Sequence, residues 1–158
     1  MRIPGLGRLK RWLRRLRGGS IILTYHRIAE ADVDPHLLCV TPKHFSEHLE
    51  HLRRRYYPLS LQDLYRRLIE GRVPRRGVVV TFDDGYVDNL RNAKPLLERY
   101  AIPATVFVVS GKVGDTKKFW WHRLEHLLLS QRALPPELTL SIGGRVYTWP
   151  TATPKERR

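Results

Sequence analysis

The order of apolar and polar residues along the chain predicts strands that alternate with helices. The clearest strand is 77–82, where three consecutive valines make both faces apolar. Shorter apolar runs at 20–25 and 104–110 predict two more buried strands, and 57–59 predicts a brief one. Helical periodicity and capping residues predict helices over four ranges: 42–55, 61–70, 89–100 with an irregular first turn at Pro95, and 119–130.

This alternation is typical of the α/β class with a parallel sheet. Counting strands leaves the architecture open, because about four strands could belong to a small open sheet or to part of a barrel of about eight. Beyond them, Gly143-Gly144 separates two short apolar runs and predicts a hairpin over 138–148. The polar, turn-rich residues 150–158 are expected to form a disordered tail.

The first 19 residues form a separate arm in this interpretation. Residues 6–17 predict a short basic amphipathic helix, which could lie on an anionic membrane surface. A solvated arm, or a helix that lies against the rest of the protein, fits the same pattern. Its apolar positions follow three- and four-residue steps: Leu6, Leu9, Trp12, Leu13 and Leu16.

Composition limits the remaining possibilities. The chain has 158 residues, of which 42% are hydrophobic and 28% charged, so one domain with an apolar core is expected. Half of the formal net charge of +14 comes from the arm, and no nucleic-acid-binding module is recognisable, so no specific nucleic-acid partner is expected. Neither a secretory signal nor a membrane-spanning run is visible, which favours a cytoplasmic or membrane-peripheral location.

Two adjacent carboxylates, Asp83 and Asp84, follow the strand 77–82 directly. The carboxyl ends of parallel strands are where active sites collect, and Gly85 permits an unusual backbone turn beside them. Adjacent carboxylates repel each other, and a bound cation relieves that repulsion. However, Asp-Asp-Gly is also ordinary turn sequence, so the spacing alone leaves function and structure equally open.

Several short motifs in collinear order resemble the NodB-type polysaccharide deacetylase family. They are Thr-Phe-Asp-Asp-Gly-Tyr at 81–86, Asp88-Asn89, Pro-Ala-Thr-Val-Phe-Val at 103–108, Leu-Thr-Tyr-His-Arg at 23–27 and Phe-Trp-Trp at 119–121. The resemblance implies that 20–149 form a partial (β/α) barrel of this type, incomplete at its C-terminus.

The same resemblance implies a function. Members are metal-dependent hydrolases that remove acetyl groups from the acetamides of amino sugars, so an acetylated amino-sugar polymer or a glycolipid is the expected partner. Matching the motifs residue by residue makes Asp83 the general base, His26 the general acid and Asp84 a ligand of a divalent metal, zinc in particular.

The chain departs from the family pattern in one important respect. The family's His-Ser/Thr-x-x-His motif, which supplies two metal ligands, is absent, so a fragment is expected. A catalytically inactive, truncated or membrane-associated remnant is therefore an alternative. A second alternative is a zincin-like hydrolase that uses His122, Glu125 and His126, although His44–His48 matches the same His-x-x-Glu-His pattern and shows how unspecific it is.

Overall fold

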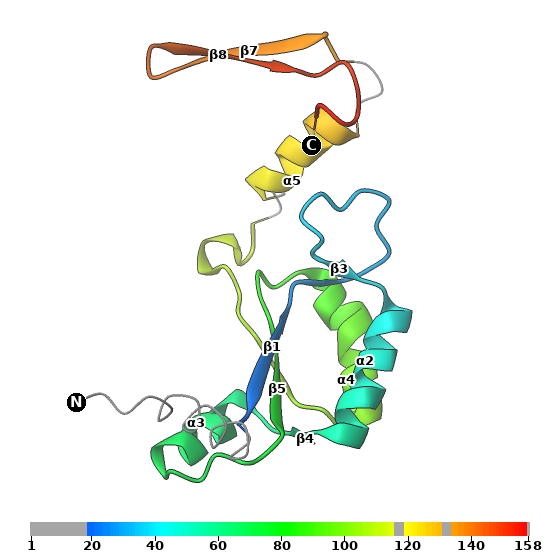
Figure 1. The fold of residues 1–158 in the computed structure, drawn as a ribbon, viewed down its shortest axis with the longest axis vertical. Helices are drawn as coiled ribbons and strands as arrows, with labels where there is room; N and C mark the ends of the chain where they lie inside the picture. Colours follow the sequence, from blue (N-terminus) through cyan, green and yellow to red (C-terminus); the bar gives the residue numbers. More distant parts are fainter. Residues whose placement is uncertain (1–18, 116–118, 131–133, 158) are drawn as a thin grey trace, which may run out of the picture. The chain divides into compact units, whose positions relative to one another are not determined.

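The computed structural model describes residues 19–115, 119–130 and 134–157, which fall into two compact units (Figure 1). The first unit runs to Glu30 and continues over Leu38–Val113, and the second comprises Ala31–Leu37 and the chain from Gly114 onward. The predicted basic helix 6–17 lies outside the described residues. Within the described ranges, every helix is too short or too polar to cross a lipid bilayer.

A parallel sheet built around β5 (Gly77–Phe82) forms the centre of the first unit. β1 (Ile21–Tyr25) pairs in parallel along one edge of β5. On the other side of β5, β4 (Tyr57–Pro58) pairs with its first residues and β6 (Ala104–Val106) with its last. All three pairings are parallel, which confirms the predicted α/β class with a parallel sheet.

Burial differs strongly between the strands. All six residues of β5 are buried, as the valine run predicts. The expectation of a buried strand is wrong for the start of β1, where Ile21 and Ile22 are 40% and 51% exposed. β6 is also largely exposed and shorter than predicted, and a 3₁₀ turn, η2 (Ser110–Lys112), follows it. Among the described residues β1 and β6 pair only with β5 in this sheet, so each leaves an outer edge uncovered.

The first two predicted helices are confirmed together with their caps. α2 (Pro42–Arg55) begins after Thr41, whose side chain accepts a hydrogen bond from the backbone N–H of His44 at 3.2 Å. α3 (Leu61–Ile69) begins after Ser60, which accepts an equivalent bond at 3.0 Å. Each cap satisfies a backbone donor that has no partner inside its own helix.

The third predicted helix has the irregular first turn that Pro95 suggests. It begins as a π-helical turn, η1 (Asn89–Ala93), and continues as α4 (Lys94–Tyr100). Proline has no backbone N–H and cannot close the usual four-residue bond, whereas the N–H of Lys94 reaches back five residues to the carbonyl of Asn89. The widened turn lies at the carboxyl end of β5, close to the predicted catalytic residues.

The core of the first unit lies between the sheet and the two neighbouring helices α2 and α4 (Figure 1). Phe45 from α2 lies at its centre, with its ring centroid 5.1 Å from Tyr25 and 5.9 Å from Phe82. The other buried residues of this cluster are Ile28, Leu49, Leu52, Val78, Val80, Ala93 and Ile102. The core therefore supports β1 and β5 at the point where both strands end.

The first unit also holds a small two-stranded ladder beside the sheet. β2 (Arg27–Ile28) pairs in parallel with β3 (Cys39–Val40) immediately after β1 ends. The backbone N–H of Ala29 extends this ladder with a 3.0 Å bond to the carbonyl of Val40.

The second unit contains one helix and the predicted hairpin. α5 (Trp120–Leu129) is followed by β7 (Glu137–Ile142) and β8 (Arg145–Pro150), which pair in antiparallel fashion. Thr151, which follows β8 at the start of the predicted tail 150–158, is buried. Its N–H and hydroxyl donate to the carbonyls of Pro136 and Pro135 at 2.8 and 2.6 Å.

Replacing Phe45 by alanine should lower the free energy of unfolding by about 3–5 kcal/mol, because a fully buried ring leaves a cavity beneath the strand ends. Urea denaturation measures the change. Tyr65→Ala on α3, where the side chain is 64% exposed, is the matched control and should cost less than about 1 kcal/mol. Equal losses in the two variants would contradict the assigned core.

Candidate active site

The two predicted catalytic residues lie together because β1 and β5 end side by side. Tyr25 pairs with Phe82 in the parallel register, so the next residues, His26 and Asp83, emerge at the same edge of the sheet. The backbone N–H of Asp83 donates to the carbonyl of Tyr25 at 3.0 Å and closes this end of the ladder. His26 Nε2 lies 4.0 Å from Asp83 Oδ2, and their side chains are 31% and 43% exposed. This separation leaves both groups accessible to a substrate.

The turn after Asp83 depends on an unusual backbone conformation. Asp84 has a φ of +68° and Gly85 a φ of +67°. Aspartate tolerates this left-handed region better than most residues, and glycine adopts it without cost. A Cβ atom at Gly85 would also lie only 2.9 Å from Cγ1 of Val108. Glycine is therefore required for both its conformation and its size, which the sequence motif alone could not separate.

Tyr25, the residue before His26, is anchored in the core by its own ring. Its ring lies against Phe45 and Phe82, and its hydroxyl lies 3.3 Å from Nδ1 of His48 on α2. Burial raises the pKa of the Tyr25 phenol above its ordinary value of 10.0. The phenol therefore remains neutral and able to form this hydrogen bond across the physiological range.

Asp88 contributes a network for which the sequence offered no role. Its Oδ2 accepts from Nε of Arg27 at 3.1 Å, and its Oδ1 accepts from the backbone N–H of Ile28 at 3.0 Å. Asn92 adds a third bond, from Nδ2 to the carbonyl of Ile28 at 2.7 Å. Asp88 belongs to the motif quoted above, but its partners are about 60 residues earlier in the chain, a proximity that only the fold creates.

The charge of this pair is held firmly. Burial lowers the pKa of the Arg27 guanidinium, but the hydrogen bond and charge of Asp88 outweigh it, and the net shift is upward. The guanidinium carbon also lies 5.1 Å from the centroid of the Tyr86 ring, a favourable cation–π distance. Arg27 is therefore always charged beside Asp88.

The described residues do not by themselves fit a zinc ion. Such a site needs about three protein ligands, and across residues 19–115, 119–130 and 134–157 no three His, Cys, Asp or Glu side chains are grouped to hold a metal. Asp84, the predicted metal ligand, would supply one carboxylate and would need further ligands to hold the ion. No catalytic step can therefore be derived through a metal from these residues.

The zincin-like alternative gains no support from α5. His122 Nδ1 lies 3.0 Å from Glu125 Oε2, a contact between neighbouring helical turns. These two residues and His126 form no metal-binding group within the described part of the chain. The contact is instead typical of an ordinary pair on a helix.

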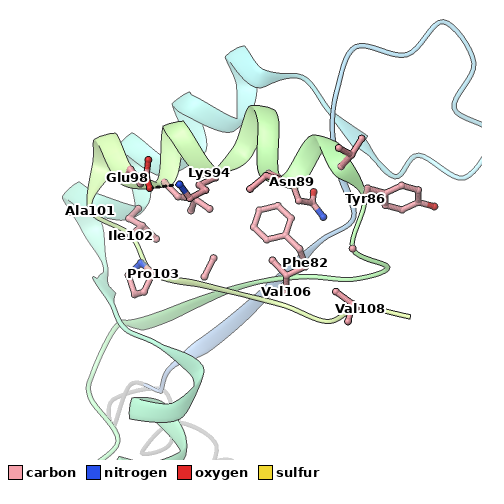
Figure 2. Close-up of a pocket in the computed structure, with 15 residues that line it drawn as sticks. Phe82, Tyr86, Asn89, Lys94, Glu98, Ala101, Ile102, Pro103, Val106 and Val108 are labelled. Atoms are coloured by element: carbon pink, nitrogen blue, oxygen red, sulfur yellow. Dashed lines mark ion pairs between the residues drawn. The ribbon is translucent and has the colours of Figure 1, made fainter. Parts of the chain in front are cut away.

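An apolar groove of about 800 Å³ begins beside the candidate site, between α4 and β6 (Figure 2). Phe82, Ile102 and Val106 line it, and Lys94 and Glu98 form an ion pair of 2.8 Å at its helical wall. Asn89 also lines it, and both polar atoms of its buried side chain lack a hydrogen-bond partner among the described residues. Buried polar atoms usually have a hydrogen-bond partner, so the hydrogen-bonding capacity of the Asn89 side chain is unused in this wall of the groove.

Comparison with known proteins gives the class of the chain. Residues 70–135 match the family model described as polysaccharide deacetylase. The poly-β-1,6-N-acetyl-D-glucosamine N-deacetylase of Staphylococcus epidermidis is 28% identical over 131 residues, which cover 75% of this chain and 44% of that protein.

Two solved structures agree with this match. The Streptococcus pyogenes deacetylase PplD, solved in complex with acetate, is 30% identical with a TM-score of 0.54, covering 67% of this chain and 50% of its own. IcaB from Ammonifex degensii is 28% identical with a TM-score of 0.55, covering 72% and 49%. The chain is thus similar to polysaccharide deacetylases, and it spans about half of the length of these relatives or less.

Replacing Gly85 by alanine should destabilise the protein more than the same change at Gly71. Both glycines have a φ of +67°, but nothing lies within 4 Å of a Cβ at Gly71. Gly71→Ala should therefore cost about 1–2 kcal/mol from backbone strain, and Gly85→Ala about 1–3 kcal/mol more from the contact with Val108. Urea denaturation measures these losses. Adding Val108→Ala to Gly85→Ala should remove most of the extra loss of stability, and an unchanged extra loss would show that the contact with Val108 is not its cause.

Replacing Tyr25 by phenylalanine should reduce the loss of stability at alkaline pH. Because folding raises the pKa of this phenol, its contribution is complete below the unfolded value of 10.0 and disappears as pH rises through the folded value. Urea denaturation from about pH 8 to pH 11 measures the slope. Tyr65→Phe, at an exposed tyrosine, is the control, and identical slopes in both variants would refute the assignment to Tyr25.

Proposed function

We propose that this protein acts in the N-deacetylation of an acetylated amino-sugar polymer or glycolipid. The observation that carries the proposal is the 4.0 Å approach of His26 to Asp83 at the carboxyl end of the sheet, in a chain similar to polysaccharide deacetylases. The S. epidermidis relative is named for deacetylating poly-β-1,6-N-acetyl-D-glucosamine, so β-1,6-linked N-acetylglucosamine is the first substrate to test.

The two side chains have complementary tasks in this hydrolysis. Asp83, as a carboxylate, accepts a proton from the water molecule that attacks the acetamide carbonyl carbon. His26, in its protonated form, donates a proton to the amine nitrogen as the carbon–nitrogen bond breaks. The products are acetate and a free amino sugar. Imidazole suits the acid role because it exchanges protons near neutral pH.

Asp84 is proposed as one ligand of a divalent cation, zinc in particular. A carboxylate is a suitable ligand, and the cation would polarise the carbonyl that is attacked. The other ligands would come from a part of the deacetylase domain that this chain does not match, since the matched residues cover only about half of each related chain. The same reasoning makes the sheet of this chain part of a (β/α) barrel.

Replacing Asp83 by asparagine should lower acetate release from β-1,6-linked N-acetylglucosamine oligomers by at least about a hundredfold, because the proton acceptor is lost. The assay measures acetate with added zinc, both for this chain and for the chain extended to a full-length domain. Asp63→Asn is the control: this carboxylate pairs with Arg66 and accepts from Ser60 at the start of α3, and its replacement should leave acetate release unchanged.

Two results would contradict the proposal. One is the absence of acetate release from any acetylated amino-sugar oligomer by the extended, zinc-supplied protein. The other is full activity of Asp83→Asn. Zinc binding, measured by equilibrium dialysis, separately tests the inactive-remnant alternative: one bound zinc ion that is lost in Asp84→Ala argues against it.

A further inference from the structure

The position of His26 is not set by its own side chain. Within the part of the chain that the structure describes, the His26 ring makes no hydrogen bond, and its approach to Asp83 at 4.0 Å is too long for one. Its place opposite Asp83 must therefore come from the backbone on either side.

On its N-terminal side, that backbone is held by the end of the parallel ladder. The carbonyl of Tyr25 accepts from the N–H of Asp83 at 3.0 Å, which ties the two strand ends together. One attachment point still allows the following residue to rotate, because each residue has two soft backbone dihedrals. A second attachment beyond His26 is needed to fix its direction.

Asp88 provides that second attachment. Its carboxylate bonds both the side chain of Arg27 and the backbone N–H of Ile28, and so holds the two residues that follow His26. Asp88 is itself only 7% exposed, and each of its oxygens has a partner. Asn92, one turn further along η1, holds the carbonyl of Ile28 at 2.7 Å. The segment after β5 thus forms hydrogen bonds with the chain on both sides of His26, through Asp83 to Tyr25 and through Asp88 to Arg27 and Ile28.

We propose that Asp88 is a positioning residue for the candidate active site, which holds His26 opposite Asp83 by clamping Arg27 and Ile28. Asp83 and Asp88 belong to the same short segment after β5. A shift of that segment therefore moves the base and the support of the acid together, which preserves their separation. The functional meaning of this clamp rests on the proposed acid role of His26, whereas the clamp itself can be tested without any turnover.

Asp88→Asn is the most direct test, because the amide keeps the shape of the carboxylate but has one acceptor oxygen and no charge. In NMR experiments on the full chain, the N–H of Ile28 should exchange with solvent about tenfold faster or more. The N–H of Asp83, on the other side of His26, should also exchange several times faster, and the His26 ring signals should broaden or split.

Glu50→Gln is the matched control. Glu50 forms an exposed ion pair with Arg54 at 3.1 Å, the same length as the Arg27–Asp88 contact, and it should change none of these signals. The ring signals of His48 provide an internal reference for those of His26. His48 lies on α2, and its ring contacts the Tyr25 hydroxyl rather than Asp88.

A purely local role for Asp88 would accelerate exchange at Ile28 alone and leave the His26 ring and the Asp83 amide unchanged, which would overturn the proposal. Removal of a buried partner could also unfold the protein. Arg27→Lys is therefore the second variant, because it keeps the charge and the Asp88–Ile28 bond but loses the planar guanidinium. It should broaden the His26 ring signals to a smaller degree, and unchanged signals in this variant would equally overturn the proposal.

In an extended, active protein, Asp88→Asn should lower kcat much more than it changes KM, because ordering of the acid matters for the reaction rather than for binding. This result separates the two proposals. If His26 becomes disordered but no acetate is released by any variant, the clamp holds and the proposed function fails.

Discussion

Five consecutive residues of β1 pair in parallel with β5, and this ladder determines most of what the first unit can do. The two strands come from segments about 57 residues apart, and they must end at the same level for His26 and Asp83 to meet. Successive side chains of a strand point to opposite faces of the sheet. A shift of the register by one residue would therefore direct one of these two side chains away from the other. The hydrogen bond between Thr24 and Thr81, at 3.0 Å inside the ladder, favours the observed register.

The same sheet explains where the surface of this unit is apolar. β5 has neighbours on both edges and is buried, whereas β1 and β6 each pair only with β5 among the described residues of this sheet. Their outer residues are consequently exposed, and the groove between α4 and β6 follows from the same geometry. Exposed strand edges present backbone N–H and C=O groups that can pair with another strand.

Charge is used differently in two parts of the protein. Half of the formal net charge of +14 lies in residues 1–17, which hold seven basic and no acidic residues. The Arg27–Asp88 pair is instead partly buried, hydrogen-bonded and located next to the candidate site. A buried pair adds little net stability compared with apolar residues of similar size, but it is strongly directional. Such directional contacts can orient the backbone beside His26, whose ring makes no hydrogen bond within the described part of the chain.

The sequence by itself determined the α/β class, the helix caps, the irregular turn at Pro95 and the residues that carry the family resemblance. These features are local, because each depends on side chains within a few positions of one another. The sequence could also place Asp83 after a strand, but not beside His26.

Only the tertiary structure decided which strands have exposed edges and which distant groups meet. The exposure of Ile21 depends on sheet neighbours rather than on the apolar run that contains it. The sequence marked Asp88 as part of a motif but not its partners, because Arg27 and Ile28 become its neighbours only when β1 pairs with β5. The physical reason is the same in both cases: periodicity records local preference, whereas strand order and long-range hydrogen bonds arise from packing of the whole unit.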